Sequence, residues 1–408
     1  MSHMRGDPNA RLTILSEAEK TALYGIPNFD DFQRIEFLAM TEAERSLALQ
    51  RRGILKQVYC LLQIGYFKAK QGFFQFTLDE VPPEDVAFLL QRYFPGQMLT
   101  AEPLSTKEYY AQRREIVALF DYRLWTDNDF PTLCDKAKLL ARTDVMPTFL
   151  LAELMVFLVG QRIVRPGYST LQTIIRDALT VERDRLEQLV EATMTEATRK
   201  ALQQLLERDD ALSELAALKQ DAKSFRYRQM GMERQQRLTL APLYTIAKTL
   251  LPSLDISQLN IAYYASLANF YTIYDLRRFK PGQTNLYLLC YAWQRYRQLT
   301  DNIVEAFGYH TRHLEDDTKA VATKQAAQIH NERQQATPRV GELLLLYVDE
   351  SLTDVTPFGA VRGKAFSIMP EEKLRSTGKL LTETPVSQMD LRWQAVCYVR
   401  RNPGLITP

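Results

Sequence analysis

Tyrosines and arginines follow one another at helical spacing between Leu259 and Phe307. Arginine forks match phosphate oxygens and guanine edges, and tyrosine adds a flat ring and a hydroxyl without a charge. This mixture predicts a helical surface that fits a nucleic-acid groove. The alternative is a buried aromatic core, in which the rings serve packing alone. The residues are Tyr263, Tyr264, Tyr271, Tyr274, Arg277, Arg278, Tyr287, Tyr291, Trp293, Arg295, Tyr296 and Arg297.

Charge is segregated along the chain. The formal net charge of the 408 residues is only +2, yet residues 222–300 contain eleven lysines and arginines against three acids. Residues 182–221 carry ten acids and six bases. Local charge, more than the total, steers an anionic partner to a surface. The pattern therefore favours a polyanion such as DNA as the partner of the basic segment.

The elements that must position these residues are predicted to be helices. Apolar residues recur every three or four positions, and alternating β-branched runs are nearly absent, so we expect an all-α protein of several domains. Capping boxes at Ser16, Thr41 and Ser105 predict three helix starts. A helix is expected over 54–70 after a break at Gly53, and this pair of helices has helix-turn-helix proportions.

Turn signals divide the chain further. Proline predicts helix starts at Pro83, Pro147 and Pro242, and later breaks at Pro252, at the Pro281–Gly282 turn and at Thr337–Pro338. About 100 to 200 residues per domain would give two to four domains. We expect an expression-tag or disordered start over 1–10, a first helical DNA-binding module over 11–128 and a second module over 129–221. An aromatic and basic module over 222–336 and a linker or assembly domain over 337–408 complete the prediction.

Composition excludes several classes of protein. The four cysteines lie far apart, which favours neither a disulfide framework nor a zinc knuckle and fits a reducing cytoplasm, with bacterial nucleoid association if DNA is the partner. The most apolar run, near Phe149, contains Glu153 and is shorter than the roughly 18 to 20 residues that cross a bilayer. We expect no membrane contact, no small-molecule substrate and no cofactor or metal in this chain.

Carboxylates and histidines give little support for chemistry at a metal. A nuclease needs carboxylates that converge on Mg²⁺, whereas the acids at 315–317 and at 349–354 are neighbours in sequence and would diverge on a helix. They are expected to form solvated faces or caps. His310, His313 and His330 are expected to be surface residues, because a zinc site needs three or four converging ligands.

Three groups of motifs resemble the replicative transposases of the Tn-three family. The first resembles that family's first helical module, the second a central signature and the third a later one. In order, they are Arg51–Gly53, Gln63–Lys68 and Asp121–Arg123; then Asn260–Ala265, Tyr274, Leu276–Arg278 and Tyr287–Cys290; then Asp349–Ser351, Thr356–Phe358, Val361, Arg362 and Lys364–Phe366.

The resemblance implies the DNA-recognition and assembly half of a transposase. Its partner would be double-stranded DNA at the terminal inverted repeats, with self-association in the full transposase. The family's catalytic triad sits in an RNase H-like domain that follows the matched region, so we expect no catalytic residue here and no cutting by this chain alone. Mg²⁺ is expected only for that further domain. The alternatives are a helical protein-interaction scaffold and a DNA-binding repressor of transposition.

Fourteen basic residues are the predicted DNA contacts. Such residues supply phosphate contacts, which give position and salt-dependent affinity, while base-edge contacts give specificity. They are Arg51, Arg52, Lys56, Lys68, Arg113, Arg114, Arg123, Arg226, Arg228, Arg277, Arg278, Lys280, Arg295 and Arg297.

Overall fold

The computed structural model describes residues 12–99, 104–209, 212–383 and 388–401, and it confirms the all-α prediction. The expected tag at 1–10 lies outside these residues. Within them, the only sheet is a two-stranded antiparallel hairpin, in which Arg208 pairs with Ser213 and Asp209 with Leu212. The fold is therefore built from helix packing.

The chain divides into two compact units. Unit 1 comprises Met1–Lys219 and Leu240–Tyr296, and unit 2 comprises Gln220–Thr239 and Arg297–Pro408. The predicted domain boundaries at 128, 221 and 336 stay predictions. The elements are α1 Glu17–Tyr24, α2 Asp31–Leu38, α3 Glu42–Leu49, α4 Ile54–Lys70, η1 Leu78–Glu80, α5 Pro83–Tyr93, α6 Thr106–Leu119, η2 Asp127–Asp129, α7 Phe130–Thr143, α8 Pro147–Gly160, α9 Tyr168–Thr193, α10 Glu196–Gln204, β1 Arg208–Asp209, β2 Leu212–Ser213, α11 Glu214–Leu218, α12 Tyr227–Ser253, α13 Gln258–Phe270, α14 Ile273–Arg278, α15 Pro281–Leu345, η3 Leu346–Val348, α16 Phe358–Ile368, α17 Glu371–Thr382 and α18 Gln388–Arg401.

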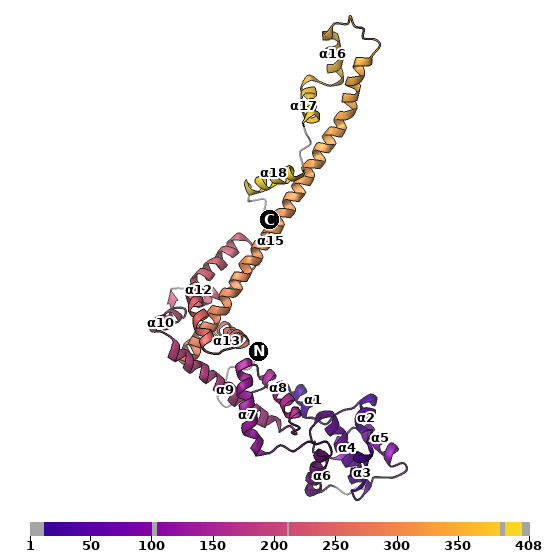
Figure 1. Ribbon diagram of the computed structural model, residues 1–408, viewed down its shortest axis with the longest axis vertical. Coiled ribbons are helices and arrows are strands. Elements are labelled where there is room, and N and C mark those ends of the chain that lie inside the picture. The colour runs from indigo at the N-terminus through magenta and orange to yellow at the C-terminus, as the bar shows by residue number, and fades with distance from the viewer. Residues whose placement is uncertain (1–11, 100–103, 210–211, 384–387, 402–408) are drawn as a thin grey trace. The chain divides into compact units, whose positions relative to one another are not determined.

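Helix α4 is the centre of the first part of unit 1. Helices α2, α3 and α5 pack against it, and α6 packs against α3 (Figure 1). Every residue from Val58 to Phe67 is buried, including the polar Gln63. Gln63 donates a hydrogen bond to the Phe74 carbonyl oxygen at 2.5 Å, which satisfies its amide nitrogen. The sequence predicted the bounds of this helix but an apolar stripe instead of burial on all sides.

Helix α4 therefore lacks the exposed face that the expected helix-turn-helix motif requires. In such motifs the second helix lies in the DNA groove with an exposed face. Helix α4 follows α3 after a turn at Gly53, whose φ of 88° is left-handed and suits glycine. However, the residues Val58–Phe67 of α4 are buried against α2, α3 and α5. Only its two ends, Ile54–Gln57 and Lys68–Lys70, are partly accessible, so α4 is a core helix and not a recognition helix.

The predicted helix starts are confirmed where capping chemistry marks them. Ser16, Thr41 and Ser105 each cap a helix through a reciprocal box with the glutamate three residues later. Two helices were not predicted from the sequence. They are α2, which Asp30 caps with Gln33, and α7, which begins just after the η2 turn.

Asn260 of α13 ties two distant parts of unit 1 together. Its side-chain amide donates to the carbonyl oxygens of Ala141 and Arg142 at 2.9 and 3.1 Å, and its Oδ1 accepts from Val145 N at 2.8 Å. These groups belong to the end of α7 and the residues just after it, where helices leave carbonyls without intrahelical partners. Helices α7, α8 and α9 pack on one another beside it. The amide therefore completes the C-terminus of α7.

One predicted helix start and one predicted boundary do not occur. Helix α12 begins at Tyr227 and continues through Pro242, where a helix start was expected, and α15 continues through the expected boundary at Pro338 to Leu345. A proline removes one helix hydrogen bond, but good helix formers on both sides can sustain the helix across it. In unit 2, Arg333 of α15 donates to the carbonyl oxygens of Leu380 and Glu383 at 3.0 and 3.1 Å, which holds the end of α17 on α15. Among the described residues, no helix is both long and apolar enough to cross a membrane.

The packing of α2 on α4 generates a stability prediction at Gly65. A methyl group there would meet the buried Leu38 side chain and lie 3.1 Å from the Phe37 carbonyl oxygen. Overpacking of this kind costs about 1–3 kcal/mol. We therefore expect Gly65→Ala to lower the free energy of unfolding by about that amount in chemical denaturation followed by circular dichroism.

The matched control is Gly160→Ala at the end of α8, where no described atom lies within 4 Å of the added methyl. That variant should change the free energy of unfolding by no more than about 0.5 kcal/mol. Equal denaturation midpoints for the two variants would contradict the close approach of α2 and α4.

Candidate nucleic-acid interface

Two ion pairs hold the start of α4 against α6. Arg51 bonds to Glu115, and Lys56 Nζ lies 2.6 Å from Glu108 Oε1. The hydrogen bond from Lys56, followed by those from Ser105, lowers the pKa of Glu108 to about 2. Both acids of the pairs are on α6, and both cations flank the turn at Gly53. These two predicted DNA contacts are therefore neutralised within the fold.

An exposed cationic face remains on α6 once its acids are paired. Lys107, Tyr110 and Arg114 are spaced at i, i+3 and i+7, which places them on one side of the helix, and all three are exposed. Arg52 is exposed next to Arg51, which bonds to the residue after Arg114. In the described part of the chain, the Arg52 and Arg114 side chains make no hydrogen bond or ion pair. We call Lys107, Tyr110, Arg114 and Arg52 the α6 ridge.

Arg113 lies behind this ridge in a cluster of rings. Its guanidinium is 4.9 Å from the centre of the Phe73 ring and 5.6 Å from that of Tyr109. Such contacts hold a cation over an aromatic face and leave the charge in place. Arg113 is half-buried, so it supports the ridge more than it extends it.

Lys68 and Arg123 are occupied elsewhere in the first module. Lys68 Nζ lies 3.1 Å from the Ala39 carbonyl oxygen and 3.4 Å from Glu44. Arg123 forms a two-pronged pair with Asp129 at 2.8 and 2.5 Å, and this pair lowers the pKa of Asp129 to about 2. The Arg123 backbone also bridges to Ile163. Both side chains are anchors between elements of the fold.

The predicted contacts near α14 divide between fold and surface. Arg277 and Arg278 are both exposed; Arg277 donates to the Leu206 carbonyl oxygen, and Arg278 lies 5.4 Å from the ring centre of Tyr274. Arg295 is buried, with 5% of its surface exposed, and donates to the Leu218 carbonyl oxygen at 3.1 Å. Arg295 therefore faces the interior of unit 1 in this structure.

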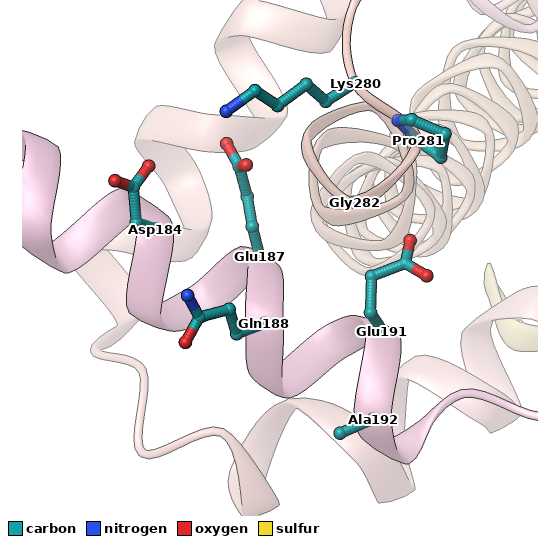
Figure 2. Close-up of a pocket in the computed structure, with 8 residues that line it drawn as sticks. All are labelled: Asp184, Glu187, Gln188, Glu191, Ala192, Lys280, Pro281 and Gly282. Atoms are coloured by element: carbon teal, nitrogen blue, oxygen red, sulfur yellow. The ribbon is translucent and has the colours of Figure 1, made fainter.

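Lys280 lies in an acidic setting at the start of α15. Figure 2 shows Lys280 extending toward the Glu187 carboxylate, with Glu191 beside Gly282. Burial raises the pKa of Glu187, and the charges of Arg183 and Lys280 oppose that rise. A methyl group on Gly282 would lie 3.2 Å from the Glu191 side chain, so the glycine permits the close approach of α9. The pocket is too acidic to attract DNA.

The tyrosines that opened the sequence analysis are mostly interior. Tyr264, Tyr287 and Tyr291 are each no more than 4% exposed, and the Tyr264 and Tyr287 rings stack at 5.7 Å. Burial raises the pKa of Tyr287 to about 12. The expected nucleic-acid surface is therefore wrong for these rings, because the aromatic core was the correct alternative. Tyr274, by contrast, is 69% exposed.

In unit 2, the segment around Tyr227 places basic and aromatic groups at the surface. Arg226 and Arg228 are exposed on either side of Tyr227, and Arg297 is exposed on α15. The Tyr227 ring stacks on the His310 ring with centres 5.1 Å apart and planes at 13°. Among the predicted acids, Asp349 lies 3.3 Å from Lys364, and no group of three metal-binding side chains occurs among the described residues.

The predicted residues thus fall into separate groups. Arg52 and Arg114 are exposed next to the paired residues Arg51 and Glu115, and Arg226 and Arg228 are exposed on either side of Tyr227 in the sequence of unit 2. Lys107 was not among the predicted contacts, although its i, i+7 spacing to Arg114 could have identified it. The pairing of Glu108 with Lys56 and of Glu115 with Arg51 depends on tertiary packing and has no signal in the sequence.

The Glu108 pair generates a pH prediction. Its pKa of about 2 lies below the ordinary 4.5, so the folded state binds fewer protons than the unfolded state between these values. The pair therefore stabilises the protein above about pH 4.5, and this contribution is lost as the pH falls toward 2. Glu108→Gln should lower stability at neutral pH and reduce the further loss on acidification, as measured by urea denaturation at a series of pH values.

Glu36→Gln, an exposed position on α2, is the control for charge removal. The idea fails if Glu108→Gln and the parent lose stability in parallel below pH 4.5.

One part of the chain resembles a known protein family. Residues 14–178 match the family model described as "Domain of unknown function (DUF4158)". The match begins before α1, includes the α6 ridge and ends within α9. The chain has no match among the curated proteins searched. Over residues 14–178, this protein is similar to a domain family whose function is not defined.

Proposed function

We propose that this chain binds double-stranded DNA at the terminal inverted repeats of a transposon, as the recognition and assembly part of a replicative transposase of the Tn-three family. Two observations support the family assignment. The domain matched by residues 14–178 is found in Tn-three family transposases. Motifs from Arg51 to Phe366 resemble that family in order along the chain.

The α6 ridge is the observation that carries the DNA-binding proposal. Arg52, in the turn before α4, and Arg114, on α6, are both exposed, and their sequence neighbours Arg51 and Glu115 pair with each other. Lys107 lies on the same face of α6 as Arg114. The pairing of Glu115 with Arg51 and of Glu108 with Lys56 removes the acids that would otherwise repel a polyanion. The ridge thus presents cations at a convex helix surface, where phosphates can approach.

The ridge would act mainly on the DNA backbone. Each cation that replaces a condensed counterion adds affinity that weakens with salt, with a slope of about 0.9 per contact in duplex DNA. Tyr110 can contribute a hydroxyl to phosphate or sugar. Such contacts fix register and orientation, and specificity for a repeat comes from base-edge contacts in addition.

A chain that binds transposon ends in this way can act in two settings. As part of a transposase it would position the ends for a catalytic domain. By itself it would occupy the same ends and compete with the transposase, which is the repressor alternative. Both settings need the same duplex contacts, so the first test addresses binding.

A protein-interaction scaffold is the second candidate, and one surface favours it. In unit 2, Leu344, Leu345, Tyr347 and Val348 lie at the end of α15 and in η3, and each is more than 60% exposed. Exposed apolar clusters of this kind often mark protein contacts. A scaffold without DNA binding would show no preference for a duplex.

The duplex prediction uses the variant Arg52→Ala/Arg114→Ala. The probe is a 30-base-pair duplex carrying the terminal repeat next to the coding region, followed by fluorescence anisotropy over a salt series. Loss of two phosphate contacts should weaken binding and reduce the slope of log affinity against log salt by about two. The parent should prefer this duplex over one of scrambled sequence.

Arg92→Ala is the matched control, because Arg92 is an exposed arginine on α5 that contacts the rings of Phe88 and Tyr93. It should leave the salt slope unchanged. An unchanged slope in the ridge variant would remove the ridge from the interface, and absence of duplex binding by the parent at low salt would refute the proposed function.

A further inference from the structure

Unit 2 contains a built aromatic stack at its surface. His310 Nε2 shares a 2.6 Å hydrogen bond with the Phe225 carbonyl oxygen, which fixes the orientation of the imidazole. The Tyr227 ring lies nearly parallel on this imidazole, with the centres 5.1 Å apart. Tyr309 supports the stack from the side, since its ring lies 5.5 Å from His310 and 5.3 Å from Phe225.

One face of the Tyr227 ring remains open. His310 covers one face, yet 63% of Tyr227 is exposed. Exposure of a ring this large costs hydrophobic free energy that a buried position would recover, so packing alone does not explain why the ring stands at the surface. A ring held flat by its neighbours loses little freedom when a second planar group stacks on it. The stack therefore leaves one face of the Tyr227 ring available to a further planar group; we call Tyr227 and His310, with Arg226 and Arg228, the platform.

The sequence on either side of Tyr227 is basic and exposed. Arg226 and Arg228 are the sequence neighbours of Tyr227, both are exposed, and their side chains have no ion pair in the described part of the chain. Lys223 is exposed three residues before Arg226. The nearby acid Glu233 is buried and accepts a hydrogen bond from Asn302 at 3.0 Å, so it does not offset the surface charge of the arginines.

We propose that this platform, Tyr227 on His310 with Arg226 and Arg228, binds single-stranded DNA. An unpaired base stacks on the open face of Tyr227, and the two arginines take the flanking phosphates. In a duplex the base faces are covered by neighbouring pairs, so only an unpaired base can use the ring. Stacking is tolerant of sequence, because every base has a flat face.

The inference goes beyond duplex recognition in both its ligand and its residues. It predicts that the chain holds an unpaired stretch of DNA, such as one beside a processed end, while the α6 ridge holds duplex. The choice of DNA over RNA rests on the proposed function. The stacking itself does not, so either proposal can fail without the other.

The test measures binding of a fluorescent twenty-nucleotide thymidine strand to the full chain by anisotropy. Tyr227→Ala should weaken binding by about tenfold to a hundredfold. Tyr227→Trp should retain it, because indole offers a larger face. Arg226→Ala/Arg228→Ala should weaken binding and reduce its salt dependence. The 30-base-pair duplex should bind the Tyr227 variants as it binds the parent.

Tyr347→Ala is the matched control, since Tyr347 is a tyrosine of the same unit with 80% of its surface exposed. It should bind the strand like the parent. Equal losses for Tyr227→Ala and Tyr347→Ala, or strand binding unaffected by any of the Tyr227 and arginine changes, would overturn the platform. If Tyr227→Ala folds poorly in thermal melts, the test rests on the other variants: the platform requires strand binding to be retained in Tyr227→Trp and weakened in Arg226→Ala/Arg228→Ala.

Two further measurements separate the proposals. The ridge variant Arg52→Ala/Arg114→Ala should bind the thymidine strand like the parent, so loss of strand binding there would show that the ridge and not the platform holds it. A uridine strand of equal length tests the choice of nucleic acid. Tighter binding of RNA than of DNA would overturn the assignment to DNA.

Discussion

The burial of α4 on all sides is the constraint on which the first module depends. A helix that is apolar around its whole circumference has to be enclosed, and here α2, α3 and α5 pack around it. Ten consecutive residues, Val58–Phe67, are unavailable to any ligand as a result. Only the two ends of the helix, Ile54–Gln57 and Lys68–Lys70, stay partly accessible, and the pairs to Glu108 and Glu115 fix α6 at the N-terminal end. The position of the α6 ridge is therefore a consequence of core packing.

Residues of one chemical type have different roles because of what lies opposite them. Arg51 and Lys56 each face a glutamate of α6, while Arg52 and Arg114 face solvent. A surface ion pair adds only about 0–1 kcal/mol of stability, so the main effect of these pairs is to set geometry and local charge. Tyrosines divide in the same way. Tyr287 stacks in the interior, whereas Tyr227 offers a ring face to solvent.

Local chemistry made part of this structure predictable. The start of α6 at Ser105, the bounds of α4 and the all-α class followed from capping boxes, a glycine break and apolar spacing. Burial did not follow, because an aromatic residue on a helix serves a core or a surface equally well, and only the tertiary partner decides. Arg295 shows the same ambiguity for a charge, since a carbonyl oxygen at Leu218 satisfies it inside unit 1. The continuation of α15 through Pro338 was missed because a single proline can be outweighed by its flanks.

Asn260 bears on how the molecule could be dissected. The stretch shared with the domain family ends at residue 178, yet the end of α7 obtains its hydrogen-bond partners from a side chain far downstream. A fragment that ends at residue 178 would lack α13 and expose the surface that α13 covers. The Ala141 and Arg142 carbonyl oxygens and the Val145 N–H would then have to bond to water. The limits of a recognisable sequence family and those of a self-sufficient folding unit therefore differ here, and any truncation intended to behave natively has to carry α13 with it.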